Sequence, residues 1–463
     1  MSKRSLWLLL GGLLIAAATG AVAQTTSSFP GGWLEKDAAG VRARYSTAQI
    51  LSFVPSLRGT FTFPAPYNTR GVRITDASDC AGGADCVNYV GYSYWRNTNA
   101  HQNSNDMLIF IGLATNRGGA GPMLFKLNKT TDTITKVGPL FAAGSKFVNY
   151  TGEGWYFSAN ASRPNTLYMY DGPKMLRYDV VNRTFETVFD ITAQFGSDRH
   201  IWQMHSSNDD LVHTATLRVA STGEFLGCLA YLESTKTFRW YPKIGVYDEC
   251  NLDKSGRWTI SLEDIGVPND LAMRIFDNQT GQETRISGPN GTLGHLDTGY
   301  GYAIGADNHN ALPNASILWA FNPSIVQGPV VQYNVNWNVA AVNHISHPNS
   351  KPGVPASQQH ACGSDASTNY SVQNEITCFR IDGTTNQLIV APVMTDPNAS
   401  GGCCDFYAKQ PKGNLDITGR YFIWTTNLGG NRMDAFLVKV PSQLLVTGSD
   451  TTPPAAPVNL RFQ

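Results

Sequence analysis

The sequence has few charged residues and no excess of either sign. Its 463 residues include 35 Lys and Arg against 35 Asp and Glu, and charged residues make up only 15% of the chain. Binding to nucleic acid requires clustered Lys and Arg and a basic balance, because contacts with phosphates dominate the affinity. We therefore expect no nucleic-acid partner.

Long apolar runs are also missing, except at the N-terminus. A basic pair at residues 3–4 precedes the apolar run 6–18, and small residues follow at 21–23. This order is typical of a secretory signal peptide. A retained membrane anchor fits less well, because the run is short and interrupted by two glycines. We predict a signal peptide over residues 1–23, cleavage near Ala23, and a secreted or periplasmic mature protein without a membrane span.

Cysteine pairs with the Cys-x-x-Cys spacing of a zinc site are absent. In an exported chain the eight cysteines indicate disulfides instead. Cys80 and Cys86 bracket a short loop and can pair locally. The adjacent Cys403 and Cys404 can bond to each other, although bonds to two different partners are favoured. The full connectivity stays open, and the candidates are Cys80, Cys86, Cys228, Cys250, Cys362, Cys378, Cys403 and Cys404.

Helical periodicity is absent as well, and a hairpin pattern takes its place. An apolar strand, a turn with Asp, Asn or Glu beside Thr or Gly, and a second strand recur along the chain, for example at 123–137 and 175–188. Such turns flanked by alternating β-branched and aromatic residues are typical of β-hairpins. The copies lie about 45 to 60 residues apart, a period typical of propeller blades of four short strands.

Seven copies predict an all-β, disulfide-stabilised β-propeller with seven four-stranded antiparallel blades. The propeller is expected over residues 58–447, after an irregular segment 24–57 and before a Pro-rich C-terminal tail 448–463. The seventh copy, at 435–441, keeps only one strand of its hairpin. We expect the N-terminal segment to supply the missing strand, which would close the ring and remove exposed strand edges.

A second pattern marks the turn between the first two strands of some blades. It is seen in Leu252-Asp-Lys-Ser-Gly-Arg-Trp258 and in Gly413-Asn-Leu-Asp-Ile-Thr-Gly-Arg-Tyr421. These segments resemble the corresponding turns of TolB/WD40-like propellers, although the Trp-Asp dipeptide is absent. The resemblance implies a propeller fold, and fold-level likeness says little about function.

One aligned position in this pattern is polar in five consecutive copies. It is occupied by His205, Asn251, His295, His344 and Asn414. Because the first strand of each blade lines the central channel, these side chains are expected to form a ring around the channel mouth. A buried apolar position would not carry three His and two Asn.

Two interpretations of this ring compete. In the first, His205, His295 and His344 hold a divalent cation (Mn, Ca or Zn) or an anionic ligand, with help from Asp297, His347 or the segment that ends at His360. Neutral imidazole is the commonest metal ligand. In the second, which is slightly favoured, each polar side chain bonds the backbone of its own turn.

The first interpretation is similar in outline to oligogalacturonate lyases. These propellers use a metal held by His and Gln for β-elimination on uronic-acid chains. The resemblance implies a metal-assisted lyase acting on acidic glycans, but the sequence offers no convincing general base.

Other candidate residues carry weaker signals. The adjacent carboxylates Asp248 and Glu249 are expected to be a solvated pair. Aromatic residues that could serve as platforms for sugar rings are more often packing residues in propellers; they are Trp95, Trp155, Trp202, Tyr300 and Tyr302. Neither a Gly-x-Ser-x-Gly nucleophile elbow nor a phosphate-binding glycine loop is present.

The sequence therefore predicts an exported propeller that binds an extracellular polysaccharide or a protein, with the metal-assisted lyase as the alternative. Under the binding interpretation, the residues expected to contact ligand are His205, Asn251, His295, Asp297, His344, His360 and Asn414.

Overall fold

A computed structural model describes most of the chain. The described residues are 28–35, 42–88, 90–150, 152–264, 271–286, 294–306, 316–321, 330–331, 344–364, 366, 374–384 and 387–445. The predicted signal peptide and Pro-rich tail lie outside them. None of the helices in these residues is long and apolar enough to cross a membrane.

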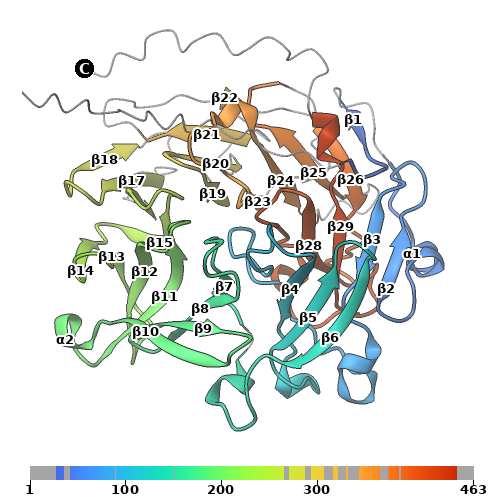
Figure 1. The fold of residues 1–463 in the computed structure, drawn as a ribbon, viewed down its shortest axis with the longest axis horizontal. Helices are drawn as coiled ribbons and strands as arrows, with labels where there is room; N and C mark the ends of the chain where they lie inside the picture. Colours follow the sequence, from blue (N-terminus) through green and yellow to red (C-terminus); the bar gives the residue numbers. More distant parts are fainter. Residues whose placement is uncertain are drawn as a thin grey trace, which may run out of the picture.

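Seven β-sheets surround a common centre, which confirms the predicted seven-bladed propeller (Figure 1). Neighbouring strands within each blade are antiparallel. In blades 2 to 5 the first strand in sequence lies nearest the centre, and these inner strands line a central channel (Figure 1).

The first three blades follow one another along the chain. Blade 1 contains β4 (Asp106–Ile111), β5 (Met123–Asn128) and β6 (Thr133–Pro139). Blade 2 contains β7 (Tyr156–Phe157), β8 (Thr166–Asp171), β9 (Lys174–Asp179) and β10 (Thr184–Asp190). Blade 3 contains β11 (Arg199–Ser206), β12 (Val212–Val219), β13 (Phe225–Leu232) and β14 (Thr237–Pro242).

The next two blades repeat the four-stranded arrangement. Blade 4 contains β15 (Val246–Leu252), β16 (Trp258–Asp264), β17 (Leu271–Asp277) and β18 (Glu283–Ile286). Blade 5 contains β19 (Leu296–Thr298), β20 (Tyr302–Ala306), β21 (Ser316–Ala320) and β22 (Val330–Val331).

The last two blades are each extended by N-terminal strands. Blade 6 contains β23 (His344–Ser346), β24 (His360–Ser364), β25 (Glu375–Arg380) and β26 (Gln387–Pro392), with β1 (Trp33–Glu35) added at its outer edge. Blade 7 contains β27 (Asn414–Leu415), β28 (Tyr421–Thr426) and β29 (Asp434–Lys439), followed by β3 (Arg70–Arg73) and β2 (Gly59–Thr62).

Strand β3 closes the ring as the sequence predicted. Val72 on β3 lies opposite Leu437 on β29, and the backbone N–H of Ile74 donates to the carbonyl of Ala435 at 2.9 Å. An N-terminal segment thus supplies the fourth strand of the last blade, joining the two ends of the propeller.

The predicted hairpins form β5 and β6 in blade 1 and the third and fourth strands in blades 2 to 4, and their turns are held by short polar side chains. Asn128 Oδ1 accepts from the backbone N–H groups of Thr130 (3.1 Å) and Thr131 (3.0 Å). In the next blade, Asp179 Oδ1 accepts from Val181 (2.9 Å) and Asn182 (2.8 Å). Bonds of this kind are the reason why Asn and Asp favour turns. The turn predicted at Asn322 lies outside the described residues.

Short helices interrupt the sheets, which the sequence did not predict. The α-helices are α1 (Thr47–Phe53), α2 (Thr192–Phe195) and α3 (Phe406–Lys409). The 3-10 helices are η1 (Ala77–Asp79), η2 (Ala81–Gly83), η3 (Thr115–Arg117), η4 (Lys146–Asn149), η5 (Ala356–Gln358) and η6 (Ser442–Leu445). Helix α1 lies within the segment expected to be irregular, and a capping box of Ser46 and Gln49 begins it.

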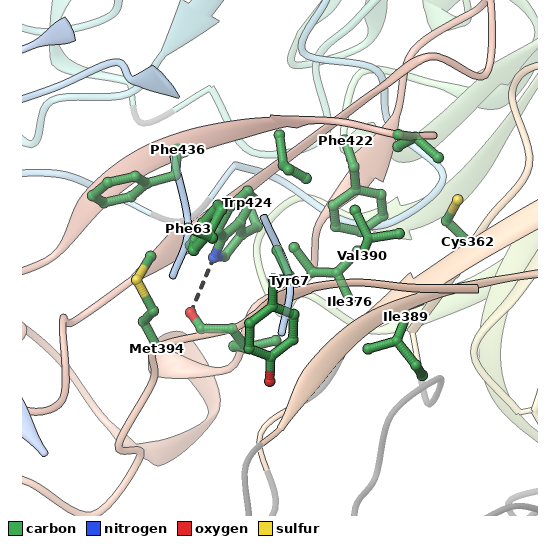
Figure 2. Packing of buried hydrophobic residues seen from close by; sticks show 14 of the residues in the cluster. Phe63, Tyr67, Cys362, Ile376, Ile389, Val390, Met394, Phe422, Trp424 and Phe436 are labelled. Carbon is green, nitrogen blue, oxygen red and sulfur yellow. Dashed lines mark hydrogen bonds between the residues drawn. The ribbon is translucent and has the colours of Figure 1, made fainter. Parts of the chain in front are cut away.

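Apolar side chains pack between neighbouring sheets. Between blades 6 and 7, Trp424 and Phe422 meet Ile376, and the Trp424 indole N–H donates to the carbonyl of Val393 at 3.1 Å (Figure 2). Phe63 from the N-terminal segment packs into the same cluster. The closing strands are therefore part of the hydrophobic core.

All eight cysteines form disulfides. The Cys80–Cys86 pairing is as predicted. Cys228–Cys250 joins β13 to β15, and Cys362–Cys378 joins β24 to β25. The preference for separate partners at Cys403 and Cys404 is wrong, because these neighbours bond to each other. Four disulfides are typical of proteins in an oxidising compartment.

Candidate functional site

The aligned polar residues lie on the inner strands of five consecutive blades. His205 is in β11, Asn251 in β15, His344 in β23 and Asn414 in β27, while His295 directly precedes β19. Asn251, His344 and Asn414 are almost fully buried, and His205 and His295 are partly exposed.

The turns that follow these strands are held by aspartates two residues further on. Asp253 Oδ1 accepts from the backbone N–H of Trp258 at 2.9 Å, and Asp416 Oδ1 accepts from Tyr421 at 2.7 Å. The hydrogen bonds of the aligned asparagines go elsewhere: Asn251 Nδ2 donates to Glu249 (2.8 Å) and Asn414 Nδ2 to Asn97 (2.8 Å). Turn formation therefore does not explain these two asparagines.

A segment that precedes blade 1 fills the centre of the propeller. We call residues 90–102 the channel segment. Asn97 and Asn99 pair with β4 as an innermost strand, with the Phe110 N–H donating to the carbonyl of Asn97 at 3.1 Å and the Asn99 N–H donating to the carbonyl of Leu108 at 3.0 Å. Earlier in the segment, the Trp95 indole donates to the carbonyl of Met204 in β11 at 3.0 Å.

Aromatic side chains of the channel segment separate the three predicted metal ligands. The rings of His295 and His344 are stacked, with centroids 4.1 Å apart and an interplanar angle of 14°. The Tyr92 ring lies 5.2 Å from His344, whereas the ring of His205 lies 4.9 Å from Tyr94. The structure thus brings two of the three histidines together and places the third against different aromatic rings.

A metal ion requires unprotonated donor groups that converge on one point. Burial lowers the pKa of His344 well below its ordinary value and that of His205 to about 3, so both rings are neutral, the form that binds metals. A metal ion, however, lies in the plane of each imidazole that binds it, and the planes of His295 and His344 are nearly parallel. No group of three or more His, Cys, Asp or Glu in the described part of the chain is arranged to hold an ion.

A buried carboxyl group lies against the channel segment. Glu249 is 9% exposed, accepts from the Tyr94 hydroxyl at 2.9 Å and from the Asn251 amide, and borders the exposed Asp248. Burial, followed by the charge of Asp248, raises the pKa of Glu249 from 4.5 to about 7. The expectation of a solvated carboxylate pair is therefore wrong for Glu249, which points into the propeller.

Asp297, His347 and His360 form a separate hydrogen-bonded group. Asp297 accepts from Lys254 Nζ at 2.7 Å and from the His347 backbone N–H at 2.5 Å. The His347 ring bonds the carbonyl of His360 (3.0 Å) and the Tyr302 hydroxyl (2.7 Å). His360 begins β24, the second strand of its blade, so it does not belong to the inner-strand ring.

An open depression lies at one end of the channel. Each inner strand runs into the first turn of its blade at this end, which we call the turn end. The depression has a volume of about 450 Å³, within the range of about 300 to 1,000 Å³ typical of ligand pockets. Its lining comes from six of the seven blades: Gln102, Ala159, Asn160, Ala161, Asn208, Asp209, Tyr300, Ser350, Lys351, Ile417 and Thr418.

One aromatic ring lines this depression, and it is held in place by a neighbour. Asn208 Nδ2 donates to the Tyr300 hydroxyl at 3.1 Å. The other aromatic residues singled out in the sequence are packing residues: Trp95 and Trp155 are buried, and Trp202 stacks on Phe225 at 5.6 Å.

The channel segment and most of the turn-end lining were not predicted from the sequence. The run Tyr92-Ser-Tyr-Trp-Arg96 carries no turn pattern that would align it with the other inner strands. One signal in the sequence could have located it. Only one strand that fits the repeat precedes the first hairpin copy, so no residues were assigned to the innermost strand of that blade.

The comparisons with known proteins show the fold. No protein-family model matches the sequence, and no curated protein matches it. An oligogalacturonate lyase from Vibrio parahaemolyticus superposes with a TM-score of 0.57 at 8% identity, over 84% of this chain and 98% of that chain. An oligogalacturonate lyase in complex with manganese gives a TM-score of 0.40 at 11% identity, over 84% and 98% of the two chains.

TolB from Acinetobacter baumannii gives a TM-score of 0.36 at 11% identity, over 66% of this chain and 63% of that chain. Identities this low carry no information on activity. The superposition on the Vibrio parahaemolyticus lyase shows that the chain is similar in fold to a known propeller.

Proposed function

We propose that this protein is an exported propeller that binds polysaccharide at the turn end of its channel. The observation that carries the proposal is the depression at that end. Amide and hydroxyl side chains such as Asn160, Asn208 and Thr418 surround it beside the Tyr300 ring.

This lining suits the chemistry of a sugar. Sugar hydroxyls both donate and accept hydrogen bonds, as amide and hydroxyl side chains do. The C–H face of a pyranose ring is apolar and packs on an aromatic ring, while a tyrosine hydroxyl keeps its own polar partner. Tyr300 is half-buried and oriented by Asn208, so its ring is positioned before ligand arrives.

Binding to polysaccharide can be tested by electrophoresis through gels that contain one polysaccharide each. We expect at least one polysaccharide to slow the wild-type protein. Tyr300→Phe keeps the ring but loses the hydroxyl that holds Asn208, so this variant should be slowed less. Tyr150→Phe is the control: Tyr150 is 37% exposed and does not line the depression, so this variant should behave as wild type. Unaltered mobility in every gel would refute the proposal.

The metal-assisted lyase is the second candidate, and the buried carboxyl group of Glu249 is the observation that favours it. Glu249, with a pKa of about 7, can exchange a proton at neutral pH, and its partner Tyr94 also contacts the ring of His205. The test is the metal content of the purified protein beside a His295→Ala variant. Stoichiometric metal that is lost in the variant would favour the lyase, and metal-free protein in both samples would rule out this mechanism.

A further inference from the structure

A second depression lies next to the first on the turn end. It has a volume of about 320 Å³, and its lining includes Asn99, Asn103, Asp106, Lys126, Ala161 and Asn165. Ala161 lines both depressions. We call the depression around Tyr300 the central depression and this one the lateral depression.

The same two loops border both depressions. In the channel segment and the residues that follow it, Gln102 lines the central depression, and Asn99 and Asn103 line the lateral one. In the loop after β7, Asn160 lines the first and Asn165 the second. The two hollows are thus consecutive parts of one surface that leads from the channel outward between blades 1 and 2.

The residue that the two depressions share has a small side chain. Ala161 is exposed and carries a single methyl group. A side chain of this size is compatible with a ligand that is longer than one sugar unit and occupies both depressions. The arrangement suits a linear chain rather than a single ring.

Charge distinguishes among linear polysaccharides. The central depression is lined by one acidic and one basic residue, Asp209 and Lys351. The lateral depression is lined by Asp106 and Lys126, which pair with each other at 3.4 Å. A polyuronate would call for several unpaired cationic side chains, because recognition of carboxylates relies on Arg and Lys. The charges here are balanced, and the remaining polar groups are neutral.

We propose that the two depressions form one binding site for a linear, uncharged polysaccharide, with successive sugar units lying on either side of Ala161. This inference rests on the proposed function and names its ligand class. In this arrangement one sugar ring packs on Tyr300, and Asn165 forms a hydrogen bond with a sugar unit further along the polysaccharide.

The test is calorimetric titration with oligosaccharides of two to six units. The probes are β-1,4-linked glucose, mannose and xylose series and, as the acidic counterpart, oligogalacturonates of the same lengths. We expect one neutral series to bind, with affinity rising at least tenfold from two to six units, and the acidic series to bind more weakly at each length.

Two variants locate the effect. Asn165→Ala should remove most of the gain in affinity from longer oligomers and leave the two-unit oligomer unaffected. Ala161→Phe, at an exposed position that tolerates a larger side chain, should do the same by raising the boundary between the depressions.

The possible outcomes separate this inference from the proposed function. Neutral oligomers that bind with no dependence on length, or oligogalacturonates that bind more tightly than every neutral series, would overturn the inference and leave polysaccharide binding intact. Absence of binding by all four series and by the polymers in the gel test would overturn both.

Discussion

The hydroxyl group of Tyr94 donates a hydrogen bond of 2.9 Å to Glu249 in the centre of the propeller. Tyr94 belongs to the channel segment and Glu249 to the inner strand of blade 4. The bond therefore connects the channel segment to the surrounding blades. The carboxyl group receives it far from bulk water, and burial raises its pKa to about 7.

This buried carboxyl should make stability depend on pH. Because its pKa is raised in the folded protein, its stabilising contribution is complete below the ordinary value of 4.5 and is lost as pH rises through about 7. A shift of this size corresponds to on the order of 3 kcal/mol. Glu249→Gln removes the ionisation and should reduce the loss of unfolding free energy between pH 5 and pH 8 by a similar amount.

Urea denaturation at the two pH values measures this difference. Glu186→Gln is a suitable control, because the Glu186 side chain is 65% exposed. If the unfolding free energy of Glu249→Gln depends on pH as that of the wild type does, the Glu249 carboxyl group does not ionise in a buried environment.

Closure of the ring by β3 should be essential for stability. Val72 is fully buried opposite Leu437. Val72→Asp places an unpaired carboxylate in the core and should lower the unfolding free energy by more than about 4 kcal/mol. Thr62→Asp, at an exposed position that ends β2 in the same sheet, should change it by less than about 0.5 kcal/mol. Equal effects of the two substitutions in urea denaturation would argue against closure by β3.

The disulfide between blades 3 and 4 should stabilise the protein more than the bond between adjacent cysteines. Cys228–Cys250 closes a loop with a sequence separation of 22, for which chain entropy predicts about 3 kcal/mol. Cys403–Cys404 has a separation of 1 and closes almost no loop. Thermal unfolding of the two double Cys→Ala variants compares them directly, and an equal loss of stability in both would contradict this explanation.

The fold was largely predictable because it depends on local, repeated signals. Turn residues such as Asn128 and Asp179 bond their own backbone, so they mark hairpins without reference to the rest of the chain. The incomplete seventh copy showed that a strand from elsewhere was needed, and β3 supplies it.

The contents of the channel were not predictable in the same way. Tyr92 and Tyr94 meet His344 and His205 through contacts between residues more than a hundred positions apart, and no local pattern encodes them. Glu249 shows the same limit: alternation along a strand says that it and Asp248 face opposite sides, but not which side faces the filled channel.

The residues that line the turn end were not predictable from the sequence either, because they come from the first turns of separate blades. Tyr300 was singled out in the sequence as one aromatic residue among several. Its partner Asn208 lies in another blade, so only the folded chain distinguishes it from the buried tryptophans.

The measurement that tests the account most directly is calorimetric titration of Tyr300→Ala and Tyr407→Ala with the polysaccharide that slows the wild-type protein. Tyr300 lines the turn end, whereas Tyr407 is 49% exposed and bonds the Tyr92 hydroxyl away from the depression. We predict that Tyr300→Ala weakens binding at least tenfold and that Tyr407→Ala binds as wild type. Full affinity in Tyr300→Ala, with binding lost in Tyr407→Ala, would contradict a site at the turn end.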